Sequence, residues 1–168
     1  MNAAQYRRIF AWFEARPAAK RMLHLAARGS VAAVYLLYAA LLVGLALERS
    51  PALWPALWVP ALVFLSGTAL RAGINRPRPY ETLGFRPLFP KDTVGKSMPS
   101  RHCFSAAAIA VTAWMSVPAL GAVLGLLAVI IALSRVLEGV HYPSDVAVGL
   151  GYGTILSGLG FWVWNLIR

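Results

Sequence analysis

Two histidines and an aspartate are residue types that could together perform nucleophilic and acid–base catalysis. His141 is followed four residues later by Asp145, and His102 lies in a separate segment. A neutral imidazole is a good nucleophile near neutral pH, and a carboxylate on its second nitrogen fixes the ring's tautomer and direction. A second histidine can then protonate the leaving oxygen. We expect His141 to be the nucleophile, Asp145 its orienting partner and His102 the general acid.

Arginines accompany these three residues. Arg71 and Arg78 precede the first histidine, and Arg135 precedes the second. A guanidinium presents paired donors that match the oxygens of a phosphate group. We expect the three arginines to bind phosphate, together with the Ser100 hydroxyl and the backbone amides of residues 100–102 at a helix start.

A metal centre is the alternative use for the same side chains. His102, Cys103, His141 and Asp145 could supply ligands, but their spacing does not fit common zinc sites. The phosphoryl-transfer chemistry needs no metal ion or other cofactor. The third histidine, His24, stands alone near the expected membrane edge, and we assign it no role.

The composition indicates a membrane protein. Of the 168 residues, 59% are hydrophobic and only 13% are charged, whereas about 25% are charged in an ordinary soluble domain. Sixteen basic and six acidic residues give a net charge of +10. Such a charge fits anionic lipids, basic cytoplasmic loops or an anionic substrate. The one cysteine excludes an internal disulfide framework.

Long uncharged stretches predict an all-α protein with about five transmembrane helices. The stretches are residues 31–47, 54–70, 103–133 and 146–167. A crossing needs about 20 apolar residues, so the third stretch is too long for one crossing. Pro118 suits the first turn of a new helix, and we expect residues 103–133 to cross twice. Two crossings return both catalytic histidines to one side of the membrane.

The last span has two further features. Pro143 is expected to open it, which puts Asp145 in the first turn, where the helix dipole favours a negative charge. Gly149, Gly153 and Ser157 recur every four residues, a spacing that lets another helix approach closely.

The first 30 residues differ from the rest of the chain. Residues 1–28 hold six basic side chains interleaved with aromatic and aliphatic ones. This pattern predicts one or two amphipathic helices on the membrane surface, broken near Pro17. A partly disordered basic tail is the alternative. We therefore divide the chain into a surface segment, residues 1–30, and a transmembrane domain, residues 31–168.

The motifs resemble those of the type 2 phosphatidic acid phosphatases, which share a core with the vanadium haloperoxidases. That family has the patterns Lys-x6-Arg-Pro, Pro-Ser-Gly-His and Ser-Arg-x5-His-x3-Asp. The matching residues, in the same order, are Arg71, Arg78 and Pro79, then Pro99, Ser100, Arg101 and His102, then Ser134, Arg135, His141 and Asp145. The resemblance extends over residues 54–167. It implies a phosphohistidine at His141 and adds Ser134 to the phosphate-binding residues.

Two substitutions depart from the family pattern. Arg71 replaces a lysine, which keeps the charge but changes the geometry. Arg101 replaces a glycine and could either bind the phosphate or face lipid headgroups. Glu138 also lies within the third motif. Burying its carboxylate in the membrane without a cation beside it would cost free energy. We expect it to pair with a nearby arginine, and Arg101 is our candidate.

The resemblance implies an integral membrane lipid phosphatase that hydrolyses a lipid phosphate or diphosphate. Undecaprenyl diphosphate, phosphatidylglycerophosphate and phosphatidic acid all remain open as substrates. The expected partners are this substrate and the bilayer, with no role for nucleic acid. A catalytically inactive relative is disfavoured because every catalytic position is filled, and a haloperoxidase-like enzyme is disfavoured by the membrane spans.

The distribution of basic residues predicts the orientation. With five spans, the N-terminal segment and the motif loops share one side, which holds 14 of the 16 basic residues. The positive-inside rule places that side in the cytoplasm. Bacterial relatives mostly act on the outer face of the cytoplasmic membrane. We expect a protein of that membrane, with the cytoplasmic orientation of the site favoured.

Overall fold

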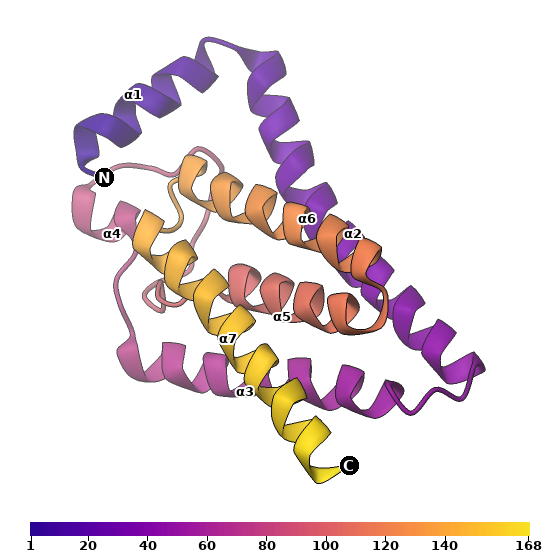
Figure 1. The fold of residues 1–168 in the computed structure, drawn as a ribbon. Coiled ribbons are helices and arrows are strands. Elements are labelled where there is room, and N and C mark those ends of the chain that lie inside the picture. The colour runs from indigo at the N-terminus through magenta and orange to yellow at the C-terminus, as the bar shows by residue number, and fades with distance from the viewer.

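The computed structural model describes residues 1–168 and contains helices but no strands. The helices, in chain order, are α1 (Ala3–Glu14), α2 (Pro17–Leu47), α3 (Leu53–Ile74), α4 (Pro79–Leu83), α5 (Arg101–Ser116), α6 (Pro118–Leu137) and α7 (Pro143–Ile167). Helices α2, α3, α5, α6 and α7 form a bundle, and the short helices α1 and α4 lie at one end of it (Figure 1). The predicted all-α class is confirmed.

Four of these helices, α2, α3, α6 and α7, are long and apolar enough to cross a membrane. Helix α5 has 16 residues, of which ten are buried, and it packs against α3, α6 and α7. It is the central helix of the bundle (Figure 1). The chain is therefore a multi-pass membrane protein with about five bundle helices, as the uncharged stretches predicted.

The turn between α5 and α6 decides where the motifs lie. Helix α5 ends at Ser116 and α6 begins at Pro118, so residues 103–133 form two helices, as predicted. The segments 71–102 and 134–145 consequently meet at the same end of the bundle. We call this end of the molecule, which also carries α1, the site end.

The N-terminal region contains two helices with a break at residues 15–16, close to the predicted position. Helix α2 begins at Pro17 and continues without interruption to Leu47. The last part of the expected surface segment is therefore continuous with the first membrane helix. Helix α1 is a separate element, capped by the Asn2 side chain, which accepts a hydrogen bond from the Gln5 amide.

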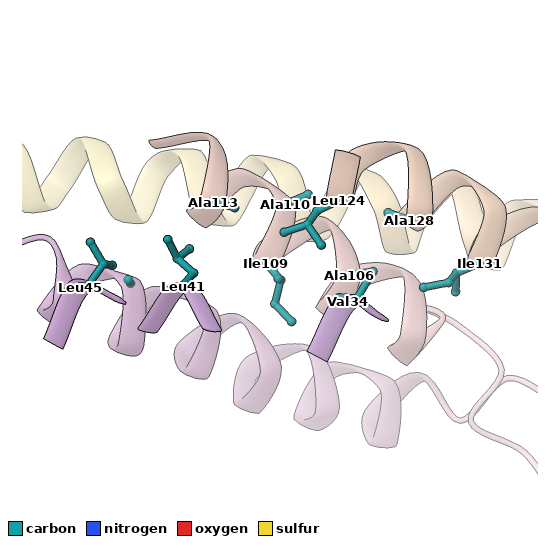
Figure 2. Close-up of a cluster of buried hydrophobic side chains, with 11 residues drawn as sticks. Val34, Leu41, Leu45, Ala106, Ile109, Ala110, Ala113, Leu124, Ala128 and Ile131 are labelled. Carbon is teal, nitrogen blue, oxygen red and sulfur yellow. The ribbon is translucent and has the colours of Figure 1, made fainter. Parts of the chain in front are cut away.

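The largest hydrophobic cluster holds α2 against the centre of the bundle. It contains Val34, Leu41 and Leu45 of α2, Ala56 of α3, Ala106, Ile109, Ala110 and Ala113 of α5, and Leu124, Ala128 and Ile131 of α6. Figure 2 shows aliphatic side chains of α2 pointing toward small residues of α5. Because alanines predominate on α5, the neighbouring helices can approach it closely.

Helices α5 and α7 are in close contact at the predicted small residues of α7. A Cβ atom added to Gly149 would lie 2.9 Å from the Ser100 carbonyl oxygen, and one added to Gly153 would overlap the Phe104 carbonyl. The Ser100 amide donates a hydrogen bond to the Asp145 carbonyl oxygen at 3.0 Å. This contact brings the motif at residues 99–102 against Asp145 of the motif at residues 134–145.

Candidate active site

A cavity of about 600 Å³ lies at the site end of the bundle. All three histidines of the chain contribute to its wall. Its basic residues are Arg28, Arg71, Arg78, Lys91, Lys96, Arg101 and Arg135, and Glu138 is its one acidic residue. A cavity with this excess of cations suits an anionic ligand.

His141 lies in the loop between α6 and α7, where its side chain is buried. Its Nδ1 atom is 3.3 Å from the Ser97 hydroxyl oxygen. That hydroxyl donates its hydrogen to Oδ2 of Asp145 at 2.5 Å. Ser97 can therefore only accept from His141, which requires the hydrogen of the neutral ring to be on Nδ1. The Nε2 atom then keeps its lone pair.

Asp145 orients His141 through Ser97 rather than directly. The distance from His141 Nδ1 to Asp145 Oδ2 is 3.6 Å, which is too long for a good hydrogen bond. The fully buried carboxylate also accepts the Tyr142 amide at 2.9 Å and Nη1 of Arg76 at 2.7 Å. These donors compensate for the removal of its negative charge from water.

The protonation state of His141 suits a nucleophile. Burial lowers the pKa of His141 from its ordinary value, and the neighbouring Asp145 opposes this shift without reversing it. The imidazole is therefore neutral at neutral pH.

Helix α1 contacts the loop that carries His141. The fully buried Tyr6 hydroxyl donates to the His141 carbonyl oxygen at 3.2 Å. Burial raises the pKa of Tyr6 to about 12, so the hydroxyl remains a donor. The rings of Phe10 and Phe85 pack beside it and enclose Gly139. Residues near the start of the chain thus restrain the backbone of the proposed nucleophile.

The three predicted phosphate-binding arginines all line the cavity. Arg71 is buried at the end of α3. Arg78 donates to the carbonyl oxygens of Gly95 and Val140 at 3.0 and 3.2 Å, which holds its guanidinium in place. The Nε atom of Arg135 is buried without a partner in the protein and is available to a ligand.

The predicted pairing of Glu138 with Arg101 is wrong. Glu138 pairs with Arg135 at 2.9 Å, because one turn at the end of α6 separates the two residues. Burial raises the pKa of Glu138, and Arg135 opposes that shift. Arg101 lines the cavity without an acidic partner.

Two other expectations about phosphate binding also need correction. The Ser134 hydroxyl donates to the Ile131 carbonyl oxygen within α6 at 2.8 Å, and Ser134 does not line the cavity. The Ser100 amide is occupied by Asp145, so it does not contribute to a cradle of free amides. The buried Ser100 hydroxyl has no hydrogen-bond partner in the protein, and Ser100, like Ser134, does not line the cavity.

Three polar residues near His141 were not predicted from the sequence: Tyr6, Arg76 and Ser97. His24, for which no role was expected, lines the cavity and packs on Phe89 with 4.6 Å between ring centroids. A serine two residues before Pro99 was the available signal for Ser97, whereas Arg76 lay in a loop with many arginines.

His102 at the start of α5 lines the same cavity as His141. His102, Cys103, His141 and Asp145 do not form a cluster of the kind that holds a metal ion. The fold and site together define a multi-pass helical membrane protein with three histidines in the wall of a cationic cavity.

The chain belongs to the PAP2 superfamily, which it matches over residues 52–168. Among solved structures it is similar to LpxE of Aquifex aeolicus, with 28% identity, a TM-score of 0.71 and coverage of 95% of this chain and 94% of that one. It is also similar to a PAP2-type phosphatidylglycerolphosphate phosphatase of Bacillus subtilis, with 23% identity, a TM-score of 0.61 and coverage of 98% and 94%. At that identity the second likeness concerns the fold alone. No curated protein gives a significant sequence match.

Proposed function

We propose that the protein removes a phosphate group from a lipid phosphate or diphosphate through a phosphohistidine at His141. The observation that carries this proposal is the orientation of the His141 ring. Its Nδ1 atom is turned toward Ser97 and Asp145 while the side chain lines a cavity with seven basic residues. The lone pair on Nε2 is therefore the one available to an anionic ligand.

Membership of the PAP2 superfamily supports a lipid phosphatase in general terms. We keep phosphatidylglycerophosphate, undecaprenyl diphosphate and phosphatidic acid as candidates. An inactive lipid-phosphate-binding relative and a haloperoxidase-like enzyme are the alternatives that the experiment below separates.

The proposed reaction has two steps. The Nε2 lone pair of His141 attacks phosphorus, the nitrogen–phosphorus bond forms, and the bond to the leaving oxygen breaks as His102 supplies a proton. A water molecule, deprotonated by His102, then attacks the phosphohistidine and releases inorganic phosphate. Arg71, Arg78 and Arg135 stabilise the charge on the phosphoryl oxygens in both transition states.

Side chains and water handle each proton and charge in this cycle, so the proposal includes no metal ion or other cofactor. The test is phosphate release by the purified protein in detergent from the three candidate lipids, with and without EDTA. We expect release to persist in EDTA and to be inhibited by vanadate, which adopts the five-coordinate geometry of the transition state.

A requirement for magnesium or zinc would contradict the mechanism. Release from none of the lipids would favour an inactive relative. Halide oxidation by the vanadate-loaded protein, without phosphatase activity, would favour the haloperoxidase-like alternative.

We further propose that the protein resides in a bacterial-type cytoplasmic membrane with the site facing the cytoplasm. Residues 1–30 then lie at the cytoplasmic surface, where basic side chains meet anionic lipids. The exposed Arg7 and Arg8 of α1 support this placement.

A further inference from the structure

One wall of the cavity comes from outside the region that matches the family. The match begins at residue 52, whereas α2 ends at Leu47. Helix α2 nevertheless contributes His24, Arg28, Val31 and Ala32 to the cavity wall. A wall that carries none of the three family motifs is suited to choosing among substrates, because it adds contacts without altering the residues of those motifs.

The helical spacing places these four residues on one face of α2. Helix α2 runs away from the site end, so the face changes from the polar His24 and Arg28 to the apolar Val31 and Ala32. Helix α3 returns toward the site end and places Thr68 one turn before Arg71. The cavity wall thus passes from the motif residues to a partly apolar part formed by α2 and α3, which suits a lipid with its tails in the bilayer.

Arg28 stands at this transition without an acidic partner. The acidic partners of arginine and lysine in the molecule are Glu14, Asp145 and Glu138, and none of them binds Arg28. Arg71, Arg78 and Arg135 already provide the positive charge proposed for the scissile phosphate. Arg28 is an additional cation on the α2 wall of the cavity.

Thr68 provides a second, independent indication of a polar ligand group here. Its hydroxyl oxygen is buried and has no hydrogen-bond partner, although the residue lines the cavity. A threonine in a helix commonly donates to the carbonyl one turn earlier, and a buried hydroxyl without any partner is costly. The hydroxyl is satisfied when a ligand oxygen accepts from it.

We propose that Arg28 and Thr68 bind a second phosphate group of the substrate, located between the scissile phosphate and the hydrocarbon tails. This inference rests on the proposed function and narrows its substrate class. The substrate is then a lipid whose scissile phosphate is joined, directly or through a short polyol, to an inner phosphate. A lipid with a single phosphate leaves Arg28 without an anionic partner.

The test compares two lipids with the same tails in neutral detergent micelles. Phosphatidylglycerophosphate has an inner phosphate, and phosphatidic acid does not. Affinity is measured by calorimetry in the His141→Ala protein, so that binding does not depend on turnover. We expect Arg28→Ala to weaken binding of phosphatidylglycerophosphate at least tenfold, which is about 1.4 kcal/mol, and that of phosphatidic acid much less.

Three further variants sharpen the comparison. Thr68→Val should also lower the preference for phosphatidylglycerophosphate over phosphatidic acid. Arg28→Lys should keep part of the preference that Arg28→Ala loses, because the positive charge is retained. Arg21→Ala is the matched control, since Arg21 is an exposed basic residue of α2 that does not line the cavity. It should leave the ratio of the two affinities unchanged.

Equal weakening for both lipids would overturn the inference, because Arg28 would then serve the scissile phosphate or the fold. It would also be overturned if Arg28→Ala acted only in vesicles containing anionic phosphatidylglycerol, which would identify neighbouring lipid headgroups as the partner. Failure of the proposed function is separately visible as absence of phosphate release by the unmodified protein.

Discussion

His141 can attack phosphorus only while Nε2 carries no hydrogen, and the neighbouring side chains decide which ring nitrogen carries it. Ser97 accepts from Nδ1 because its own hydrogen is committed to Asp145. Arg76 and the Tyr142 amide in turn keep that carboxylate charged. The proposed nucleophile thus depends on Ser97 as a positioning residue that need not touch the substrate.

The first prediction tests this dependence. Ser97→Ala removes the acceptor for Nδ1, so both tautomers of His141 become populated. We expect kcat to fall about tenfold to hundredfold, since hydrogen bonds near charged groups are worth about 1.5–3 kcal/mol. The tautomer ratio is read from ¹⁵N NMR of histidine-labelled protein. Ser97→Thr should retain the native tautomer, and an unchanged tautomer in Ser97→Ala would refute the positioning role.

The second prediction concerns pH. Burial lowers the pKa of His141, so the folded protein binds its proton only at a pH below the ordinary histidine value of about 6.5. Nε2 therefore keeps its lone pair as the pH falls through 6.5, and it becomes protonated only at a lower pH. An NMR titration, with the signal assigned by its loss in His141→Gln, should show this order. Titration at or above 6.5 would contradict it.

The third prediction separates the two histidines. His141→Ala should abolish turnover of both a lipid phosphate and an activated aryl phosphate, because no phosphorus–nitrogen bond can form. His102→Ala should cost about 10²–10⁴-fold on the lipid and far less on the aryl ester, whose leaving group needs no proton. Steady-state kinetics on both substrates provide the comparison, and equal losses would count against the division of roles.

The motifs allowed His102, His141, Asp145 and the arginines to be placed at one site before the fold was known. Arg76 and Ser97 could not be placed in the same way. They reach Asp145 across 69 and 48 residues of chain. Their loop has no helical or strand period, so its path depends on contacts that a local pattern does not contain.

At the scale of the helices, the contact between α5 and α7 sets the distance between the second and third motifs. Gly153 has no room for a Cβ atom because the Phe104 carbonyl lies against it, whereas Gly151 on the same helix has open space. The position of Asp145 relative to Ser100 therefore depends on this glycine.

The fourth prediction uses this pair of glycines. Gly153→Ala should destabilise the protein by about 1–3 kcal/mol, the usual cost of overpacking, and lower its melting temperature in detergent. Gly151→Ala is the matched control and should leave the melting temperature unchanged or raise it, because alanine favours a helix. Equal effects of the two changes would show that the contact does not limit the packing.

The lengths of the uncharged stretches predicted the number of bundle helices, and Pro118 predicted the turn between α5 and α6. The uninterrupted α2 was not predicted. Hydropathy indicates where a helix enters the apolar layer, but charged residues such as Lys20 and Arg21 are good helix formers and do not end the helix there. The start of α2 is instead determined by Pro17, which suits its first turn.

At the scale of the molecule, basic residues are concentrated at the site end, and the two termini lie at opposite ends (Figure 1). Arg49 and Arg168 are the two basic residues at the far end. The fifth prediction follows from the positive-inside rule. Alkaline phosphatase fused after Arg168 should be active and green fluorescent protein there should be dark. The reverse pattern would place the site on the outer face.

The hydrogen bond from Tyr6 to His141 joins residues 135 positions apart. Membrane proteins are made and inserted from the amino end, so Tyr6 is in place long before His141 leaves the ribosome. The hydrogen bond from Tyr6 to the loop of His141 can therefore form only when synthesis is nearly finished. Asp145 of α7 also reaches its place beside this loop only then. A nascent chain that stalls after α6 therefore has the arginines of the cavity and His102 but lacks the proposed nucleophile.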